Sequence, residues 1–336
     1  MRHIIFGGDG FVGRFLAPKL LADGHEVIVA DVVKSELPHY GAVRFVQTDV
    51  TDPEAIRKLG IRADDMVYNL SAKMLSPIQV RAKRHDFFFP VNYHGTENII
   101  KAMDEAGARS LVHFTTDMVY GHTYTWPQTE DHPCAPLGEY GLSKFKTEEL
   151  AAEWRRRGMN ITLFRPRLII GPGRLGILSK LFKLIDRNLP VPMIGSGKNP
   201  YQFISVFDCA SAAHAAFKAG VPNEVYNLGS LNPPPVRKLL GDLVKHAGSK
   251  SFLLPTPAWA VKRTLDFLDL LNMPLMDPEQ YLIADEMCVL DVSKGERELG
   301  WIPQHRDEDM LIAAYTEYRK TIAQGGEFDV AHPKAA

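Results

Sequence analysis

Residues 2–13 read Arg-His-Ile-Ile-Phe-Gly-Gly-Asp-Gly-Phe-Val-Gly, an apolar run that leads into four closely spaced glycines. This pattern is typical of the strand-to-helix turn that holds a dinucleotide pyrophosphate. Gly7 or Gly8 allows the tight turn. Gly10 lets the backbone approach the phosphates, and Gly13 lets the following helix pack closely on the sheet. The N-terminus of that helix then faces the anion.

The residues after the glycines fit the same motif. A helix is predicted from Phe11, it ends at Asp23-Gly24, and a strand over Glu26–Ala30 leads to Asp31. An acid at the end of this strand, about 20 residues beyond the glycines, is placed to accept hydrogen bonds from an adenosine ribose. Because its charge would repel a 2′-phosphate, the sequence predicts NAD rather than NADP. The alternative for Asp31 is a surface residue that caps a turn.

Length and composition predict a soluble globular protein. The chain has 336 residues, of which 45% are hydrophobic, and a formal net charge of −1. This length is enough for a large core in one domain or two closely joined domains. The charge balance lacks the basic excess typical of nucleic-acid-binding proteins. Three widely spaced cysteines, Cys134, Cys209 and Cys288, predict neither a disulfide framework nor a zinc site, and the scattered histidines predict no metal site.

The predicted location is the cytoplasm, without stable insertion into a membrane. Met1 leads directly into the first predicted strand, which leaves no room for a signal peptide. No apolar run is long enough to cross a bilayer. Residues 257–276 come nearest, but Lys262, Arg263 and Asp266 interrupt them. An amphipathic lid or core helix is therefore expected there, with interfacial membrane contact as the alternative.

Strands and helices alternate along the first half of the chain. The predicted strands are His3–Phe6, Glu26–Ala30, Val43–Gln47, Met66–Leu70, Ser110–Thr115 and Asn160–Arg165. The predicted helices are Phe11–Ala22, Pro53–Leu59, Val91–Ala106 and Tyr140–Arg157. This alternation is typical of an α/β protein with a doubly wound parallel sheet, the Rossmann arrangement. Ligands bind such sheets at the carboxyl ends of the strands, and Asp49-Val50, Ser71-Ala72 and Thr115-Thr116-Asp117 follow three of these ends.

A second constellation is Tyr140-Gly-Leu-Ser-Lys144, which places a phenol and an ammonium one turn apart on one helix face. A nearby ammonium favours the phenolate and lowers the pKa of the tyrosine. The phenolate could take the proton of a substrate hydroxyl while a hydride leaves the same carbon for NAD. Thr116 would hold the substrate oxygen, and Lys144 would bind the nicotinamide ribose. A Tyr and a Lys at this spacing are often structural, but the glycine turn, Asp31 and Thr116 favour a catalytic role.

The order of these motifs resembles the extended short-chain dehydrogenase/reductase family, in particular its nucleotide-sugar epimerases and dehydratases. The matching segments are 7–13, Asp49, 92–98, 115–121, 140–144, 165–166, 171–173, 226–229 and 299–303. The resemblance implies a catalytic triad of Thr116, Tyr140 and Lys144. It also implies adenine contacts at Asp49 and Val50 and a supporting role for Asn92, for which a helix N-cap or an internal turn bond is the alternative.

Together these arguments predict two sets of contacts. The expected cofactor contacts are Gly7, Gly10, Phe11, Val12, Gly13, Asp31, Asp49, Val50, Leu70, Ser71, Ala72, Asn92, Thr115, Tyr140, Lys144 and Arg165. The expected substrate contacts are Lys73, Asp117, Met118, Arg167, Leu168, Arg174 and Tyr201.

The sequence also departs from the family pattern. Dehydratases carry Asp-Glu after the catalytic threonine, whereas this chain has Asp117-Met118, so sugar dehydration is disfavoured. Nucleotide-sugar members commonly have an asparagine in place of Leu168 and an Arg-Asp pair in place of Tyr201-Gln202. Their absence removes an expected bidentate ligand of the diphosphate. Another ligand could come from Arg167, Arg174, Lys180, Lys183 or Lys198.

Two enzymatic hypotheses follow from this pattern. In the first, which the end-to-end match favours although Leu168 and Tyr201 argue against it, a sugar carbon of a nucleotide sugar is oxidised, and the same hydride returns to the transient keto intermediate, which is epimerisation. In the second, the ketone leaves and NADH is released, as in the 3β-hydroxysteroid dehydrogenase-like branch, whose Arg-Pro strand end and apolar lid resemble Arg165-Pro166 and residues 257–276. A catalytically silent, NAD-sensing protein is a third hypothesis, but it would have no use for Tyr140 and Lys144.

The expected organisation is an NAD-binding domain over 1–165, to which 203–228 returns, and a smaller substrate domain from 166–202 and 229–336. The resemblance suggests a homodimer that packs the helices at Val91–Ala106 and Tyr140–Arg157. A small-molecule substrate is expected as the other partner, and no nucleic acid.

Overall fold

The computed structural model describes residues 1–173, 175–176 and 178–325. Within them, seven parallel strands form one sheet in the order β10-β6-β5-β4-β1-β2-β3. The strands are β1 (Arg2–Phe6), β2 (Glu26–Asp31), β3 (Arg44–Gln47), β4 (Met66–Asn69), β5 (Ser110–Phe114), β6 (Asn160–Pro166) and β10 (Val225–Leu228). The order reverses beside β1, which creates the crevice where doubly wound sheets bind their ligands.

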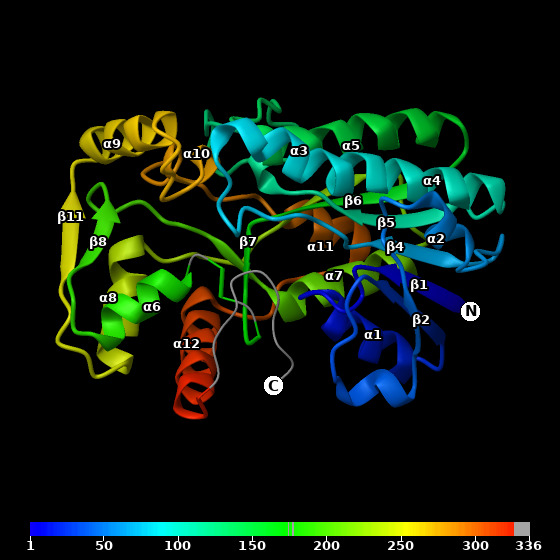
Figure 1. Ribbon diagram of the computed structural model, residues 1–336, viewed down its shortest axis with the longest axis horizontal. Coiled ribbons are helices and arrows are strands. Elements are labelled where there is room, and N and C mark those ends of the chain that lie inside the picture. Colours follow the sequence, from blue (N-terminus) through cyan, green and yellow to red (C-terminus); the bar gives the residue numbers. More distant parts are fainter. Residues whose placement is uncertain (174, 177, 326–336) are drawn as a thin grey trace.

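Helices cover both faces of this sheet (Figure 1). One face carries α1 (Gly13–Ala22) and α7 (Val206–Lys218), and the other carries α2 (Pro53–Arg57), α4 (Gly95–Glu105) and α5 (Glu139–Arg156). Neighbouring residues of β1 therefore enter different cores: Ile5 packs with Leu16 of α1, and Ile4 with Ile99 of α4. Burial on both sides explains why the central strands are continuously apolar rather than alternating.

The structure confirms the predicted α/β class and the six predicted strands. The predicted helix Val91–Ala106 begins earlier, because α3 (Arg84–Phe89) and a wide helical turn over Pro90–His94 lead into α4 without a break. The predicted helix Tyr140–Arg157 corresponds to α5. A long loop joins β5 to α5, with Thr116 as the cap of a short helical turn at its start and Gly138 directly before α5.

The second part of the chain has a core of its own, built from helices α6 (Leu178–Asp186), α8 (Val236–His246) and α12 (Asp307–Ala323). Two short parallel pairs lie beside them, one of β7 (Leu168–Ile170) with β9 (Phe203–Ser205), the other of β8 (Val191–Ile194) with β11 (Leu253–Thr256). The remaining helices are α9 (Ala258–Leu270), α10 (Pro278–Tyr281) and α11 (Ser293–Leu299).

The two parts are threaded through each other. After β9, helix α7 and strand β10 return to the main sheet, where β10 pairs with β6. Near the C-terminus, α11 packs on α7 and β10, so part of residues 229–336 also lies against the main sheet. Among the described residues, no helix combines the length and apolar character needed to cross a membrane.

Candidate active site

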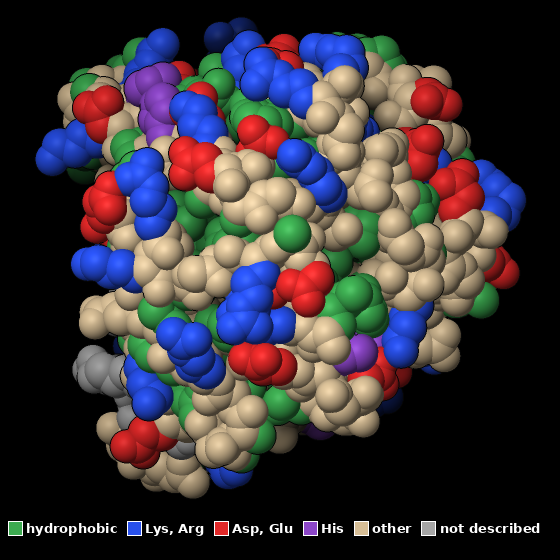
Figure 2. All heavy atoms as spheres, turned by 90° about the vertical axis from the view of Figure 1, so that its right-hand side faces the viewer, with side chains coloured by type: hydrophobic (Ala, Val, Ile, Leu, Met, Phe, Trp, Pro, Cys, Tyr) green, Lys and Arg blue, Asp and Glu red, His purple; other side chains and the backbone are tan. Residues whose placement is uncertain are grey.

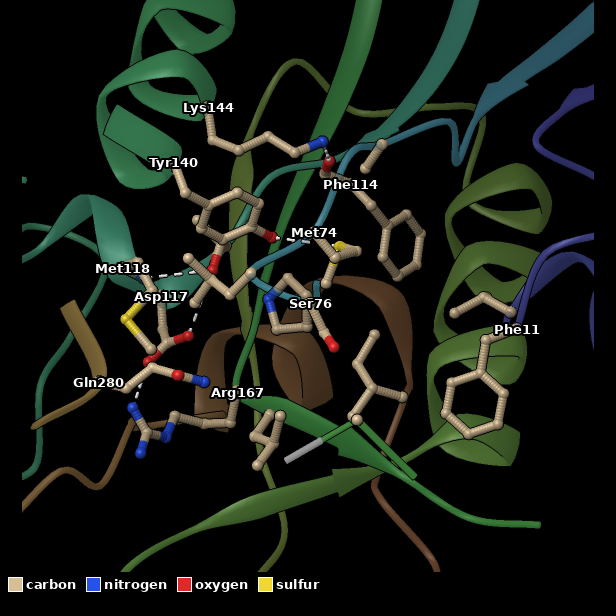
Figure 3. A pocket seen from close by; sticks show the side chains of 18 of the residues that line it. Phe11, Met74, Ser76, Phe114, Asp117, Met118, Tyr140, Lys144, Arg167 and Gln280 are labelled. Atoms are coloured by element: carbon tan, nitrogen blue, oxygen red, sulfur yellow. Dashed lines mark hydrogen bonds and ion pairs between the residues drawn. The ribbon is translucent and has the colours of Figure 1, made fainter. Parts of the chain in front are cut away.

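A cavity of about 380 Å³ lies at the carboxyl ends of the central strands (Figure 3). The glycine turn after β1, the end of β5 and the first turns of α5 form one wall, with Gly7, Thr116 and Tyr140 among the lining residues. The loop after β4 and the segments around β7 and α6 form the other wall. The sheet thus brings segments more than 100 residues apart in the sequence to one place.

Helix α5 presents Tyr140 and Lys144 to this cavity, as the spacing predicted. Both side chains are buried, and the Tyr140 hydroxyl lies 3.5 Å from the Sδ atom of Met74. The Lys144 Nζ atom donates a hydrogen bond of 2.9 Å to the backbone oxygen of Phe114. Burial lowers the pKa of Lys144 to about 7, because the charged amine loses its hydration. The lysine can therefore exchange a proton near neutral pH beside the phenol.

Thr116 completes the group of polar side chains at the end of β5. Its backbone is extended, and its Oγ1 atom accepts a hydrogen bond of 3.2 Å from the backbone nitrogen of Met118. The same hydroxyl lies 3.4 Å from the Oδ1 atom of Asp117. Because Thr116 and Tyr140 line one cavity, a substrate oxygen between them could contact both hydroxyls.

The glycine turn has the close contacts that the motif requires. Gly7 has a φ of +70°, and a Cβ atom on it would lie 2.7 Å from the backbone nitrogen of Ser71. A Cβ atom on Gly13 would lie 2.5 Å from the backbone oxygen of Gly8, where α1 begins against the turn. The backbone is thus left bare at the N-terminus of α1, which is the cradle that a pyrophosphate needs.

Asp31 stands at the base of this turn. Its carboxylate accepts hydrogen bonds from the backbone nitrogens of Asp9 at 3.0 Å and Val32 at 2.7 Å. The half-buried setting raises the pKa of Asp31, although these backbone donors oppose the rise. Asp31 therefore caps the turn and also lies beside the glycines. The turn-capping role and the predicted contact with the ribose are compatible.

Asn92 links two walls of the cavity instead of capping a helix. It lies inside the helical turn at Pro90–His94 and is fully buried. Its side chain bonds the backbone nitrogen of Lys73 at 2.8 Å and the Oγ atom of Ser143 at 3.0 Å. The N-cap alternative was therefore wrong, and Asn92 fixes the loop after β4 against α5.

Asp117 and Arg167 form a buried ion pair in the lining of the cavity. Burial raises the pKa of Asp117, although Arg167 opposes this effect. The Arg167 Nε atom also donates to the backbone oxygen of Gln202 at 3.2 Å, and its guanidinium lies 4.8 Å from the centre of the Tyr201 ring. Within the described part of the chain its Nη2 atom has no hydrogen-bond partner, so the two N–H groups of that atom are unpaired.

Comparison with known proteins places this geometry in a family. A profile of the NAD dependent epimerase/dehydratase family matches residues 3–229. The chain belongs to the NAD-dependent epimerase/dehydratase family. It is accordingly an NAD-dependent enzyme, and the bare backbone of the glycine turn together with Asp31 fits that cofactor.

Relatives of this chain within the family carry the names of different activities. The chain is 29% identical to the uncharacterized protein y4nG of Sinorhizobium fredii over 96% of its length and 81% of the relative. It is 25% identical to UDP-glucose 4-epimerase of Lactobacillus helveticus (97% and 99% covered). It is 26% identical to 2-alkyl-3-oxoalkanoate reductase of Stenotrophomonas maltophilia (93% and 97% covered).

Among solved structures, UDP-glucose 4-epimerase of Thermotoga maritima has the same fold, with a TM-score of 0.77 and 22% identity. The superposition covers 96% of this chain and 100% of that structure. Taken with the sheet order, this similarity confirms the Rossmann arrangement of the main sheet, and the shared fold extends over nearly the whole enzyme.

Several predicted contacts of the enzyme do line the cavity, namely Gly7, Phe11, Val12, Leu70, Ala72, Thr115, Asp117, Met118, Arg167, Leu168 and Tyr201. Others lie outside its lining, namely Gly10, Gly13, Asp31, Asp49, Val50, Ser71, Lys73, Asn92 and Arg165. Most of the second group surrounds the glycine turn and the ends of β2 and β3, where the adenosine half of a dinucleotide is expected. Arg174 lies outside the described residues.

Two predicted contacts are not supported by the structure. The Arg165 guanidinium is bound to Glu148, with its Nε atom at 3.0 Å, and to the Tyr120 hydroxyl at 2.9 Å. This buried network turns Arg165 away from the cavity. Lys73 is exposed, and its Nζ atom lies 5.5 Å from the centre of the Phe87 ring. Asn92 holds its backbone, so the neighbouring Met74 faces Tyr140 instead.

Sequence reasoning missed two parts of the site. The loop after β4 contributes Met74, Leu75 and Ile78 to the wall opposite α5, and apolar residues in such a loop were the available signal. The other part is Glu279 of α10, whose Oε atoms accept hydrogen bonds from the backbone nitrogens of Tyr140 at 2.9 Å and Gly141 at 2.8 Å.

Glu279 holds the first turn of α5 with a buried carboxyl group. Burial raises its pKa to about 8, and the nearby Asp277 adds to the rise. A Cβ atom on Gly138 would lie 2.5 Å from Glu279, so the glycine leaves room for this contact. No local pattern links Glu279 to α5, since 139 residues separate it from Tyr140.

Proposed function

We propose that the enzyme oxidises a secondary alcohol carbon, with Tyr140 as the base for the hydroxyl proton and Thr116 as a hydrogen-bonding partner of the same oxygen. Lys144 stabilises the phenolate electrostatically, which it can do when protonated. NAD, when bound along the glycine turn, supplies the hydride acceptor. Gly7, Gly10, Gly13 and Asp31 are the residues proposed to hold it, with Asp49 and Val50 near the adenine.

The wall opposite Tyr140 favours a largely apolar substrate. The residues there are Met74, Leu75, Pro77, Ile78, Leu168, Ile169, Leu175 and Leu178. Apolar walls with a few placed polar groups are typical of small-molecule sites that fix orientation through those groups. The charge of Arg167 is already balanced by Asp117, so the unpaired N–H groups on its Nη2 atom suit a neutral carbonyl or hydroxyl oxygen better than a diphosphate.

This wall also bears on the fate of the ketone. To return a hydride to the opposite face, an epimerase must let the keto intermediate turn while a remote part of the substrate stays anchored. The expected diphosphate anchors are replaced by Leu168 and by Tyr201, which stacks on Arg167. The lining of the cavity therefore supports release of ketone and NADH, and this observation carries the proposal of an NAD-dependent alcohol dehydrogenase.

Nucleotide-sugar epimerisation is the second candidate. Its support is the similarity to UDP-glucose 4-epimerase of L. helveticus, which extends over almost the full length of both chains. In this mechanism Lys180, whose side chain is exposed and whose residue lines the cavity, would face the diphosphate. Dehydration of the sugar is not proposed, because Met118 lines the cavity where an acid or base would be required.

One experiment separates the candidates. The purified enzyme is incubated with NAD and, separately, with nucleotide sugars and with steroid-like and long-chain secondary alcohols. NADH absorbance and the substrate NMR spectrum are recorded together. Stoichiometric NADH with an apolar alcohol is the expected result. Altered sugar signals without NADH would establish epimerisation instead, and the Tyr140→Phe variant, tested alongside, should lack either activity.

We further propose that the enzyme is a cytoplasmic homodimer that packs α4 and α5 against their copies. A groove between the α3 region and α5, lined by Phe89, Tyr93 and Leu150 among others, supports a contact there. Light scattering at working concentration should give twice the chain mass of 37.6 kDa. A monomeric mass would contradict this assembly.

A further inference from the structure

Helix α9 and the residues after it expose an unusual amount of apolar surface. Within residues 259–275, six large apolar side chains are exposed: Trp259, Phe267, Leu270, Leu271, Met273 and Leu275. We call this set the α9 apolar face. Trp259, Phe267 and Leu270 have exposed fractions of 75%, 61% and 64%. Contiguous apolar patches of this kind on a folded protein indicate an interaction surface.

Three of the four charged residues of the same helix contact other elements of the protein, and the fourth, Arg263, is exposed. Asp269 is buried and bound to Arg84 of α3, with Nη1 at 3.0 Å from Oδ2. Asp266 accepts a hydrogen bond of 2.6 Å from the Tyr281 hydroxyl. Lys262 pairs with Asp285 at 2.5 Å. The helix is therefore inverted relative to an ordinary surface helix, which buries its apolar stripe.

This inversion is fixed by the fold and cannot be relieved by rotation of the helix. Turning the apolar side chains inward would break the ion pairs of Asp269 and Lys262 and leave the buried Arg84 without its partner. The opposite end of the molecule looks different, since Figure 2 shows Lys, Arg, Asp and Glu side chains of both signs mixed over its surface. Figure 1 places α9 at the other end of the molecule, where its six exposed apolar side chains follow one another within 17 residues.

The charges of the face indicate what covers it. Both carboxylates of α9, Asp266 and Asp269, are occupied by Tyr281 and Arg84, while Arg263 is exposed. An aromatic and aliphatic face with an outward cation and no outward carboxylate is typical of helices that lie in the surface of an anionic bilayer. A second copy fits less well, because a two-fold contact pairs two identical faces, and neither face offers an outward carboxylate to Arg263 of the other.

The position of the face agrees with this occupant. Lys180 donates a hydrogen bond of 3.1 Å to the backbone oxygen of Leu275, and Lys180 and Gln280 both line the cavity. The apolar face and the apolar wall of the cavity thus adjoin each other. We propose that the α9 apolar face binds the surface of anionic lipid bilayers, without crossing them. This inference does not depend on which substrate the enzyme uses.

Tryptophan fluorescence of the full-length enzyme tests the proposal. Two of the four tryptophans, Trp154 and Trp301, are buried, and Trp126 is the other exposed one. In a Trp126→Phe variant, Trp259 should shift its emission to shorter wavelength when vesicles of phosphatidylcholine with phosphatidylglycerol are added, and brominated lipids should quench it. A Trp259→Phe variant that retains Trp126 should show neither change.

Vesicle sedimentation supplies the second measurement. Leu270→Glu and Phe267→Glu should each weaken vesicle binding roughly tenfold, since each removes one large apolar side chain from the lipid. Leu231→Glu, at another exposed leucine, is the matched control and should bind like the unmodified enzyme. Unchanged melting temperatures establish that the variants are folded.

Two outcomes would overturn the proposal. The first is a failure of the vesicle-binding test: the unmodified enzyme does not bind vesicles at low ionic strength, or Leu270→Glu binds them as tightly as the unmodified enzyme does. The second is a dimer in light scattering that Leu270→Glu converts to monomer, together with no vesicle binding, which would assign the face to a second copy.

Discussion

The two walls of the cavity are built on different principles. On the α5 side, polar groups are tied to the backbone of the sheet, as when Lys144 donates to the Phe114 oxygen. On the opposite side, Met74, Leu168 and Leu178 come from a loop, a short strand and a helix of the second part. The comparison teaches that the rigid scaffold holds the groups proposed for the reaction, whereas more variable segments determine which substrate fits. These segments can change without disturbing the scaffold.

The largest effect should come from the α5 wall. Tyr140→Phe removes the proposed base, so turnover should fall by about 10³-fold, within the range typical of general acid–base catalysis. Binding of NAD, measured by calorimetry, should stay close to normal. Tyr201→Phe, which keeps the ring that stacks on Arg167, is the matched control and should lower turnover only slightly. Comparable turnover in the Tyr140→Phe and Tyr201→Phe variants would contradict the proposal that the α5 side of the cavity carries the reaction.

The ion pair in the lining of the cavity tests how far the second wall supports stability. Arg167→Met leaves Asp117 buried without its partner, so the free energy of unfolding should fall by about 3 kcal/mol. Denaturant unfolding measures this loss. The double variant Arg167→Met/Asp117→Leu should recover much of it, because the uncompensated charge is gone. If the double variant is less stable than Arg167→Met alone, Asp117 stabilises the fold through contacts other than its pairing with Arg167.

The pH dependence of stability examines the α5 wall again. Because the pKa of Lys144 is lowered from 10.5 to about 7, the unfolded chain carries a proton at this site that the folded enzyme lacks between those values. Stability contributed by this lysine therefore rises with pH across that window, by about 1.4 kcal/mol per unit, and is constant below it. Lys144→Met should lose this slope in the absence of NAD, as followed by unfolding at several pH values.

The matched control for this measurement is Lys146→Met. Lys146 lies on the exposed side of the same helix and pairs with Glu149. This variant should keep the pH slope of the unmodified enzyme. An equal slope in the Lys144→Met variant would show that Lys144 does not titrate in this range.

The smallest effect is expected at the rim of the α5 wall, where Asp31 is proposed to contact the ribose. Asp31→Ala should weaken NAD binding about tenfold, the usual cost of losing hydrogen bonds to a charged group. The variant should also prefer NAD over NADP less strongly than the unmodified enzyme does. Asp31→Asn tests the contribution of the charge alone, because the side chain keeps its size. Calorimetric titration with both dinucleotides gives the ratio. An unchanged ratio would place the ribose away from Asp31.

Local patterns were sufficient for the scaffold and the catalytic candidates. The glycine spacing and the alternation of strands placed Gly7, Thr116 and Tyr140 at one edge of the sheet, because parallel strands bring their carboxyl ends together. Local patterns did not predict the contacts of side chains whose partners are distant in sequence. Arg165 resembles a cofactor contact in its motif, yet Glu148 and Tyr120 bind it from other elements.

The contact between Glu279 and α5 has a consequence for how the enzyme is made. The base of the proposed reaction stands on a helix whose first turn is held by a residue that the ribosome adds 139 positions later. A gene fragment that ends at residue 229, where the family match ends, would encode the strands and the glycine turn but not this carboxylate. The nascent chain can thus contain every proposed catalytic residue before it contains the residue that sets the position of the base.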